Sequence, residues 1–229
     1  MFRLHVFACL AAATLVAPAN AGITEWLAEV ADGSPAGFIA TGIASPTTAD
    51  IGVYDDQTNG GVTYEFIVNA VNGGGSSVLM GSTFAPAGDW SGLKFEQWQN
   101  TGRYGGTDFG VADYDSGIPN IVGADHQVVF VADGTNTAIY VNGVLTGSIA
   151  GFSPALSGVT GLAQAYSHIN GVTIDPLNGT LVGVAVYDSA LGAGEILEHY
   201  AAFAIPEPGS IALAALGAVA IGLFARRHA

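Results

Sequence analysis

The sequence contains one cysteine and very few basic residues. The cysteine, Cys9, lies in the first apolar segment, so the rest of the chain forms no disulfide and uses no thiol nucleophile. Residues 22–204 hold two basic side chains, Lys94 and Arg103, against eighteen acidic ones, a net charge of −16. Such a surface repels phosphate backbones, which argues against nucleic-acid binding. A domain without disulfides must be held together by its apolar core.

Charged residues make up only 10 % of the chain, whereas 33 residues are glycine, a composition that fits a β protein with many turns. Between residues 38 and 190 the apolar side chains mostly recur with a period of two, as in strands. Strands are predicted at 38–43, 51–54, 62–70, 76–80, 93–99, 127–132, 138–141, 144–149 and 180–187, with loop over 101–124. These features predict an all-β fold, a two-sheet antiparallel jelly-roll sandwich.

Helical spacing is confined to the two ends of this region. A short helix is predicted over 23–30 and a closing helix over 191–203. In the closing helix, an apolar stripe is predicted to consist of Ile196, Leu197 and Tyr200. Glu195, Glu198 and His199 fall outside the stripe, and the two glutamates are predicted to be solvated.

The N-terminus has the parts of a secretory signal peptide. Arg3 supplies a positive start, and residues 6–17 form a short apolar run. The small residues Ala19 and Ala21 mark a cleavage site after Ala21. The chain is therefore predicted to consist of a signal peptide (1–21), one domain (22–204) and a C-terminal tail (205–229).

The tail begins with Pro206-Glu207-Pro208, continues through seventeen largely apolar residues and ends with Arg226-Arg227. The prolines keep the motif extended, and seventeen residues make a helix of roughly 25 Å, enough to cross a bilayer core. The arginines hold that end in the cytoplasm. The tail resembles the PEP-CTERM sorting signal of Gram-negative bacteria. The resemblance implies processing by an exosortase-type enzyme, a transient stay in the inner membrane, and delivery to the cell surface or extracellular (biofilm) matrix; the alternative is a plain single-span anchor.

Two segments of the body carry a second resemblance. Residues 125–134, followed by Ile139-Tyr140-Val141-Asn142-Gly143, and residues 183–191, followed by Glu195-Ile196, resemble the laminin-G-like, concanavalin A-like lectin/glucanase superfamily. The resemblance implies a jelly roll of two curved antiparallel sheets. It implies no single function, because the fold hosts lectins, adhesion modules, glycosidases and inert spacers.

The residues give little support to catalysis. A retaining glycosidase needs two carboxylates roughly 5 Å apart, but Glu65 and Glu96 each stand alone on their predicted strands. No zinc-binding histidine spacing and no Gly-x-Ser-x-Gly occur. We therefore predict a non-enzymatic surface or matrix protein that binds glycans or exopolysaccharide. A structural protein without a discrete ligand and a divergent glycosidase are the alternatives.

Candidate binding residues gather near the middle of the chain. Asp113 and Asp115 point to the same side of an extended segment, with Asp108 nearby, and such oxygens suit calcium. The alternative is solvated turn aspartates. Tyr104 and Tyr114 are candidates for stacking on sugars. Trp90 and Trp98 are further candidates for this role, although a core position is favoured for Trp98.

Overall fold

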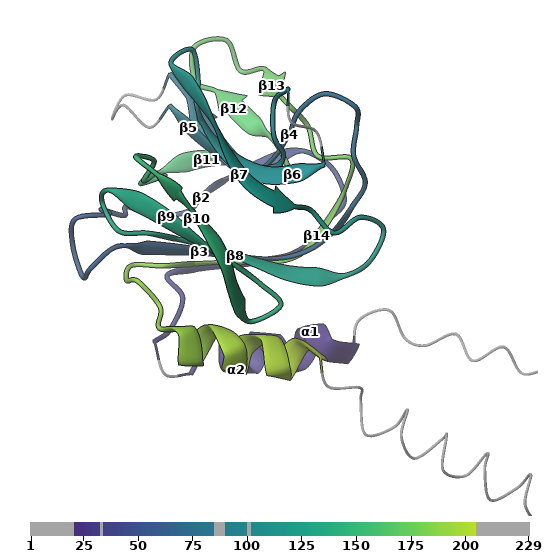
Figure 1. The fold of residues 1–229 in the computed structure, drawn as a ribbon, viewed down its shortest axis with the longest axis vertical. Coiled ribbons are helices and arrows are strands. Elements are labelled where there is room, and N and C mark those ends of the chain that lie inside the picture. The colour runs from purple at the N-terminus through teal and green to yellow at the C-terminus, as the bar shows by residue number, and fades with distance from the viewer. Residues whose placement is uncertain (1–20, 33, 85–89, 100–101, 205–229) are drawn as a thin grey trace, which may run out of the picture. The chain divides into compact units, whose positions relative to one another are not determined.

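Two β-sheets lie face to face in the computed structural model, which describes residues 21–32, 34–84, 90–99 and 102–204 (Figure 1). The first sheet has the strand order β1-β14-β3-β8-β9-β10 and is antiparallel throughout. Its strands are β1 (Phe38–Ile43), β3 (Val62–Ala70), β8 (His126–Ala132), β9 (Asn136–Val141), β10 (Val144–Ala150) and β14 (Gly179–Tyr187). The predicted two-sheet sandwich is confirmed.

The second sheet has the path β13-β12-β4-β5-β6-β7, and β11 joins it by pairing with β4 and β2. Its strands are β2 (Thr47–Asp50), β4 (Ser77–Thr83), β5 (Ser91–Glu96), β6 (Arg103–Asp108), β7 (Ala112–Pro119), β11 (Val159–Leu162), β12 (Ala165–Ser167) and β13 (Thr173–Ile174). All its pairs are antiparallel except β12 with β4. Two helices complete the body, α1 (Ala21–Glu29) and α2 (Ala193–Ala204).

Two stretches differ from their predictions. Residues 101–124 are not mainly loop, because β6 and β7 lie there. Glycine in β6 serves close packing rather than turning: a Cβ on Gly105 would collide with Gln97, and one on Gly106 with the Phe152 ring. Residues 51–54 are not a strand; β2 precedes them, and Ile51 is buried from a loop.

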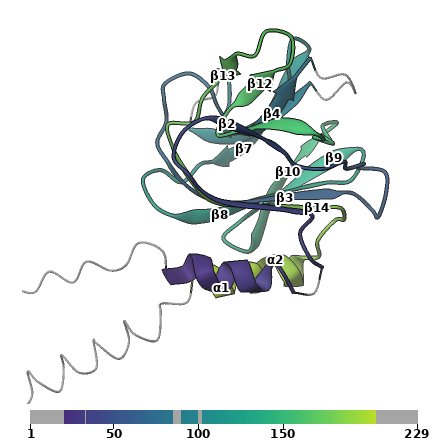
Figure 2. The ribbon, with the colours of Figure 1, turned by 180° about the vertical axis from the view of Figure 1, so that it is seen from behind.

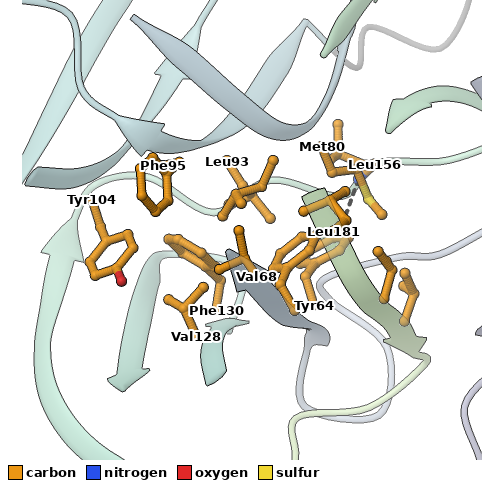
Figure 3. Close-up of a cluster of buried hydrophobic side chains, with 14 of the residues drawn as sticks. Tyr64, Val68, Met80, Leu93, Phe95, Tyr104, Val128, Phe130, Leu156 and Leu181 are labelled. Atoms are coloured by element: carbon orange, nitrogen blue, oxygen red, sulfur yellow. Dashed lines mark hydrogen bonds between the residues drawn. The ribbon is translucent and has the colours of Figure 1, made fainter. Parts of the chain in front are cut away.

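The main core fills the space between the sheets (Figure 3). Phe66 and Phe130 meet edge to face, with ring centroids 6.2 Å apart. The buried Tyr64 hydroxyl accepts a hydrogen bond from the Leu156 amide at 2.7 Å and donates one to the Pro154 carbonyl at 3.2 Å. The core therefore buries this polar atom with its hydrogen bonds satisfied.

A second apolar layer lies on the outer face of the first sheet, where α1 and α2 pack (Figure 2). Trp26 from α1 and Ile196 from α2 are fully buried against Ile67 and Val129 of the sheet. Strands β3, β8 and β14 are consequently covered on both faces, which explains their nearly continuous apolar sequences.

The buried face of α2 is rotated from the predicted one. His199, predicted to lie outside the apolar stripe, is buried, whereas Leu197, predicted to lie in the stripe, is half exposed. The physical reason lies in the sheet beneath, because His199 Nδ1 donates to the carboxylate of Glu65 at 2.8 Å. A buried partner of opposite charge outweighs the preference of histidine for solvent.

Glu65 stands at the centre of this second layer and is fully buried. Its Oε1 accepts hydrogen bonds from Trp26 Nε1 and Gln127 Nε2, both at 2.7 Å. Its Oε2 accepts them from the Tyr187 hydroxyl at 3.0 Å and from His199 Nδ1 at 2.8 Å. One carboxylate thus ties both helices and two neighbouring strands to β3, a structural role that leaves it unavailable for sugar hydrolysis.

Two buried histidines have pKa values shifted in opposite directions. Burial disfavours the charged form of His199, but its hydrogen bond to Glu65 and that carboxylate's charge, with smaller contributions from Glu29 and Glu195, raise its pKa above the usual value. Burial lowers the pKa of His126, against the weaker opposing effects of its bond to a backbone carbonyl and of a neighbouring aspartate.

These shifts predict opposite pH dependences of stability. The stabilisation that His199 contributes is fully present below about pH 6.5, the usual pKa of a histidine in an unfolded chain. It is lost as the pH rises through the raised pKa of His199 in the folded state. The contribution of His126 is present above about pH 6.5 and is lost as the pH falls through its lowered pKa. We expect the His199→Gln variant to lose less stability than the wild type as the pH rises, and the His126→Gln variant to lose less as the pH falls. Thermal denaturation across the pH range measures both effects. If His199→Gln lost as much stability as the wild type at alkaline pH, the role given to His199 would be contradicted.

Among the residues that the structure describes, no helix is long and apolar enough to cross a membrane. Ala21, the predicted last residue of the signal peptide, is the first residue of α1. The remaining signal residues, Pro206-Glu207-Pro208, the predicted membrane helix and Arg226-Arg227 lie outside the described residues. The predicted membrane helix and the domain boundaries therefore stay predictions.

Candidate functional site

The predicted binding residues lie on β6 and β7, which form the end of the second sheet. The register places Gly106 opposite Tyr114 and Thr107 opposite Asp113. Because successive side chains of a strand point to opposite faces, Tyr114 points toward the core side of the sheet and Asp113 toward its outer side. The candidates are therefore divided between two faces.

Tyr104 points into the core and is fully buried, so its predicted role in stacking on sugars is wrong. Its ring meets Phe95 edge to face, and its hydroxyl lies 2.6 Å from His126 Nε2. His126 Nδ1 lies 2.9 Å from the Ala124 carbonyl oxygen. Because a carbonyl can only accept a hydrogen bond, Nδ1 is the donor there, and Nε2 accepts the hydrogen bond that the Tyr104 hydroxyl donates. Burial raises the pKa of Tyr104, and this tyrosine–histidine pair is a satisfied part of the core.

Tyr114 is half buried at the edge of the same face. Its ring packs on Phe152 with centroids 4.8 Å apart, and its hydroxyl donates to Asp108 Oδ2 at 3.0 Å. Burial, together with the bond to Asp108 and its charge, raises the pKa of Tyr114. Asp108 also accepts a hydrogen bond from Ser91 at 2.7 Å. Both side chains are engaged with their neighbours, and a role for Tyr114 in ligand binding stays a prediction.

The three aspartates predicted for calcium are not brought together. Asp108 is on the core side, whereas Asp113 and Asp115 are on the outer face beside basic side chains. Lys94 Nζ lies 3.7 Å from Asp113, and Arg103 lies 2.7 Å from Asp115. Within residues 21–32, 34–84, 90–99 and 102–204, no three His, Cys, Asp or Glu side chains are placed to hold a metal ion. The three aspartates therefore do not form one cluster, and calcium binding by any of them stays a prediction.

The outer face of β5, β6 and β7 is instead a charged surface, which we call the charged face. It carries both basic residues of the body, paired with Asp113, Asp115 and Asp175. Lys94 is only 2 % exposed; its Nζ donates to Ser76 at 2.6 Å and to Asp175 at 3.0 Å. Paired charges at a surface can donate to and accept from hydroxyl groups, but they offer no free acid or base.

A polar depression of about 200 Å³ lies at the other side of the body, between the C-terminal end of α1 and the start of α2. Glu195 Oε2 accepts from the Gly192 amide and its Oε1 from Ser34, both at 2.9 Å, and these two bonds lower the pKa of Glu195. The glutamate therefore caps α2. The depression is lined by Glu29, Asp32, Ser34, Glu195, Glu198 and His199.

Exposed aromatic residues lie at the two ends of β5. Trp98, predicted to be in the core, is 48 % exposed, because β5 ends at Glu96 and the chain turns before Trp98. Trp90 precedes the strand and packs against Phe84, with ring centroids 5.1 Å apart. Trp90 is a candidate predicted from the sequence, whereas Phe84 is not. The signal for Phe84 is the Ala-Pro-Ala-Gly sequence that follows it, which is typical of a turn.

Comparison with known proteins identifies the fold family. The family model described as the concanavalin A-like lectin/glucanases superfamily (Laminin_G_3) matches residues 47–197, well over half of the chain. The chain belongs to this superfamily. A second model, the PEP-CTERM protein-sorting motif, matches residues 204–227 and confirms the predicted sorting motif. Both resemblances seen in the sequence are thus confirmed.

Solved structures agree with this concanavalin A-like assignment at the level of the fold. The CBM40 module of the Ruminococcus gnavus IT-sialidase, bound to α2,6-sialyllactose, has a TM-score of 0.52 and 16 % identity, covering 72 % of this chain and 99 % of the module. The same module without that ligand has a TM-score of 0.51 and 17 % identity, covering 71 % and 97 %. No curated protein matches the chain significantly.

Proposed function

We propose that the protein is an exported, non-catalytic glycan-binding module that an exosortase-type enzyme processes at the inner membrane of a Gram-negative bacterium. The observation that carries the proposal is the combination of a sorting motif at residues 204–227 with a body whose fold spans 99 % of a carbohydrate-binding module. The body thus covers nearly the whole of that module.

The surroundings of two buried glutamates support the binding role. The two strand glutamates that a glycosidase would need are both used structurally. Glu65 holds the helices, and Glu96 is buried and accepts hydrogen bonds from the Gly73 and Gly74 amides at 2.6 and 3.3 Å. The charged face, in contrast, leaves partly exposed Asp113, Asp115 and Arg103 that can bond to sugar hydroxyls.

Two measurements on the mature protein from its source organism test the proposal. A glycan array that includes α2,6-sialyllactose and acidic and neutral polysaccharides is expected to give selective binding without hydrolysis. Intact-mass analysis is expected to give a C-terminus near residues 205–209. A flat array with a normally folded protein favours a structural matrix protein, and sugar release favours a divergent glycosidase. A mass that retains Arg226-Arg227 contradicts processing.

A further inference from the structure

Three loops at one end of the second sheet carry exposed apolar side chains. They are the β4–β5 connection, of which only the two ends at Phe84 and Trp90 are described, the β6–β7 loop and the loop between β12 and β13. The side chains, which we call the apolar rim, are Phe84 (42 % exposed), Trp90 (40 %), Val111 (74 %), Ile169 (73 %) and Val172 (46 %). Single exposed apolar residues are ordinary, but a contiguous group on neighbouring loops is typical of a binding surface.

Backbone hydrogen bonds show that the three loops are neighbours. The Phe109 amide donates to the Trp90 carbonyl at 2.6 Å, which joins the β6–β7 loop to the start of β5. The His168 amide donates to the Thr83 carbonyl at 3.2 Å, which joins the β12–β13 loop to the end of β4. The Phe84 and Trp90 rings, between these two junctions, are tilted by 53° to each other.

Phe84 has an unusual backbone for an aromatic residue. Its φ is +53°, in the left-handed region, where a bulky side chain is strained. The other non-glycine residues with positive φ in the described chain are Asn59, Gln99, Asn142, Ala163 and Asp175, none of them aromatic. The Phe84 ring is not buried in return for this strain. Backbone strain at a residue whose side chain stays near solvent is typical of functional sites, so the Phe84 backbone indicates a binding role for its ring.

The apolar rim adjoins the charged face. The Phe109 ring lies over Gly92, where an added Cβ would be 3.0 Å from it, and Lys94 Nζ lies 5.7 Å from the centre of the same ring. Trp90, bonded to Phe109 through the backbone, continues the surface outward. Aromatic rings and paired charges therefore form one continuous surface.

We propose that the apolar rim is where a polysaccharide chain binds, with Phe84 and Trp90 stacked on the apolar faces of its sugar rings and the charged face bonded to its hydroxyls. This inference rests on the proposed glycan-binding function and assigns it a location. Aromatic rings suit such a ligand because the C–H groups on one side of a pyranose pack against a ring face while its hydroxyls stay in contact with water.

Charge favours a polysaccharide over a lipid surface. The body carries a net charge of −16, and none of the rim side chains is basic, so anionic lipid headgroups repel it.

The test compares two tryptophans at opposite ends of one strand. The mature protein and its Trp90→Ala and Trp98→Ala variants are run by native electrophoresis through gels that contain laminarin, xylan or alginate. For any polysaccharide that retards the wild type, Trp90→Ala is expected to bind about tenfold more weakly. Trp98→Ala, which removes a similarly exposed ring outside the rim, is expected to bind as the wild type does.

Phe84→Gly separates binding from folding. Glycine is free to adopt the positive φ, so the thermal midpoint is expected not to fall, while affinity for the same polysaccharide drops severalfold. Equal binding by Trp90→Ala and Trp98→Ala would contradict the apolar rim as the binding site but not the proposed glycan-binding function. If no gel and no glycan retained the wild type, both the binding site and the proposed function would be contradicted. Sedimentation with phosphatidylcholine–phosphatidylglycerol vesicles that Trp90→Ala abolishes would overturn the choice of a polysaccharide as the occupant.

Discussion

The Glu65→Ala variant is expected to lose about 3–5 kcal/mol of unfolding free energy, because one change removes a buried charge from its partners. The indole of Trp26, the amide of Gln127, the Tyr187 hydroxyl and the His199 imidazole would each lose a buried acceptor. Urea denaturation followed by tryptophan fluorescence measures the loss.

The matched control for this variant is Glu198→Ala, which removes an exposed glutamate from α2. It is expected to change the unfolding free energy by less than about 0.5 kcal/mol. Glu65→Gln keeps the shape and two acceptor lone pairs but removes the charge, and it should fall between the two. A loss of less than about 1 kcal/mol in Glu65→Ala would show that the network does not hold the outer layer.

Trp26→Ala is expected to cost about 3–5 kcal/mol, comparable to other deletions of large buried aromatic side chains. The indole is fully buried over Gly183, where an added Cβ would lie 2.7 Å from the ring, and it also donates to Glu65. Its removal leaves α1 without its main contact, so the N-terminal segment should become sensitive to protease before the rest of the body.

Trp98→Ala serves as the control for Trp26→Ala, because the same chemical change at an exposed position is expected to cost less than about 0.5 kcal/mol. The double variant Glu65→Ala/Trp26→Ala should lose less than the sum of the two single losses, since both remove the same hydrogen bond. Strict additivity would contradict a shared network.

The sequence predicts the parts of the fold in which periodicity and burial agree. Strand 62–70 is found with the predicted bounds, and the closing helix begins and ends within two residues of its prediction. β6 was missed because Gly105 and Gly106, typical of turns, here allow side chains from elsewhere to pack directly against the strand. Such long-range packing cannot be seen in a local pattern.

The candidate site was predicted less well for a related reason. Asp113 and Asp115 do share a face, as their spacing predicts, but only the register with β5 and β6 brings Lys94 and Arg103 beside them. Tyr104 lies in a polar stretch of sequence and yet points into the core, since its partner His126 comes from the other sheet. Partners distant in sequence, rather than local composition, decided these positions.

The first and last elements of the body lie against each other, and this sets the order in which a chain that is exported N-terminus first can fold. β1 pairs with β14, and an added Cβ on Gly22 of α1 would collide with the Phe203 carbonyl of α2. β3 has no partner on one side until residues 179–187 arrive. Such long-range pairing is slow to form and leaves strand edges open to aggregation in the meantime. The body therefore completes its folding only when the chain up to residue 204 is available, at the point where the sorting motif begins.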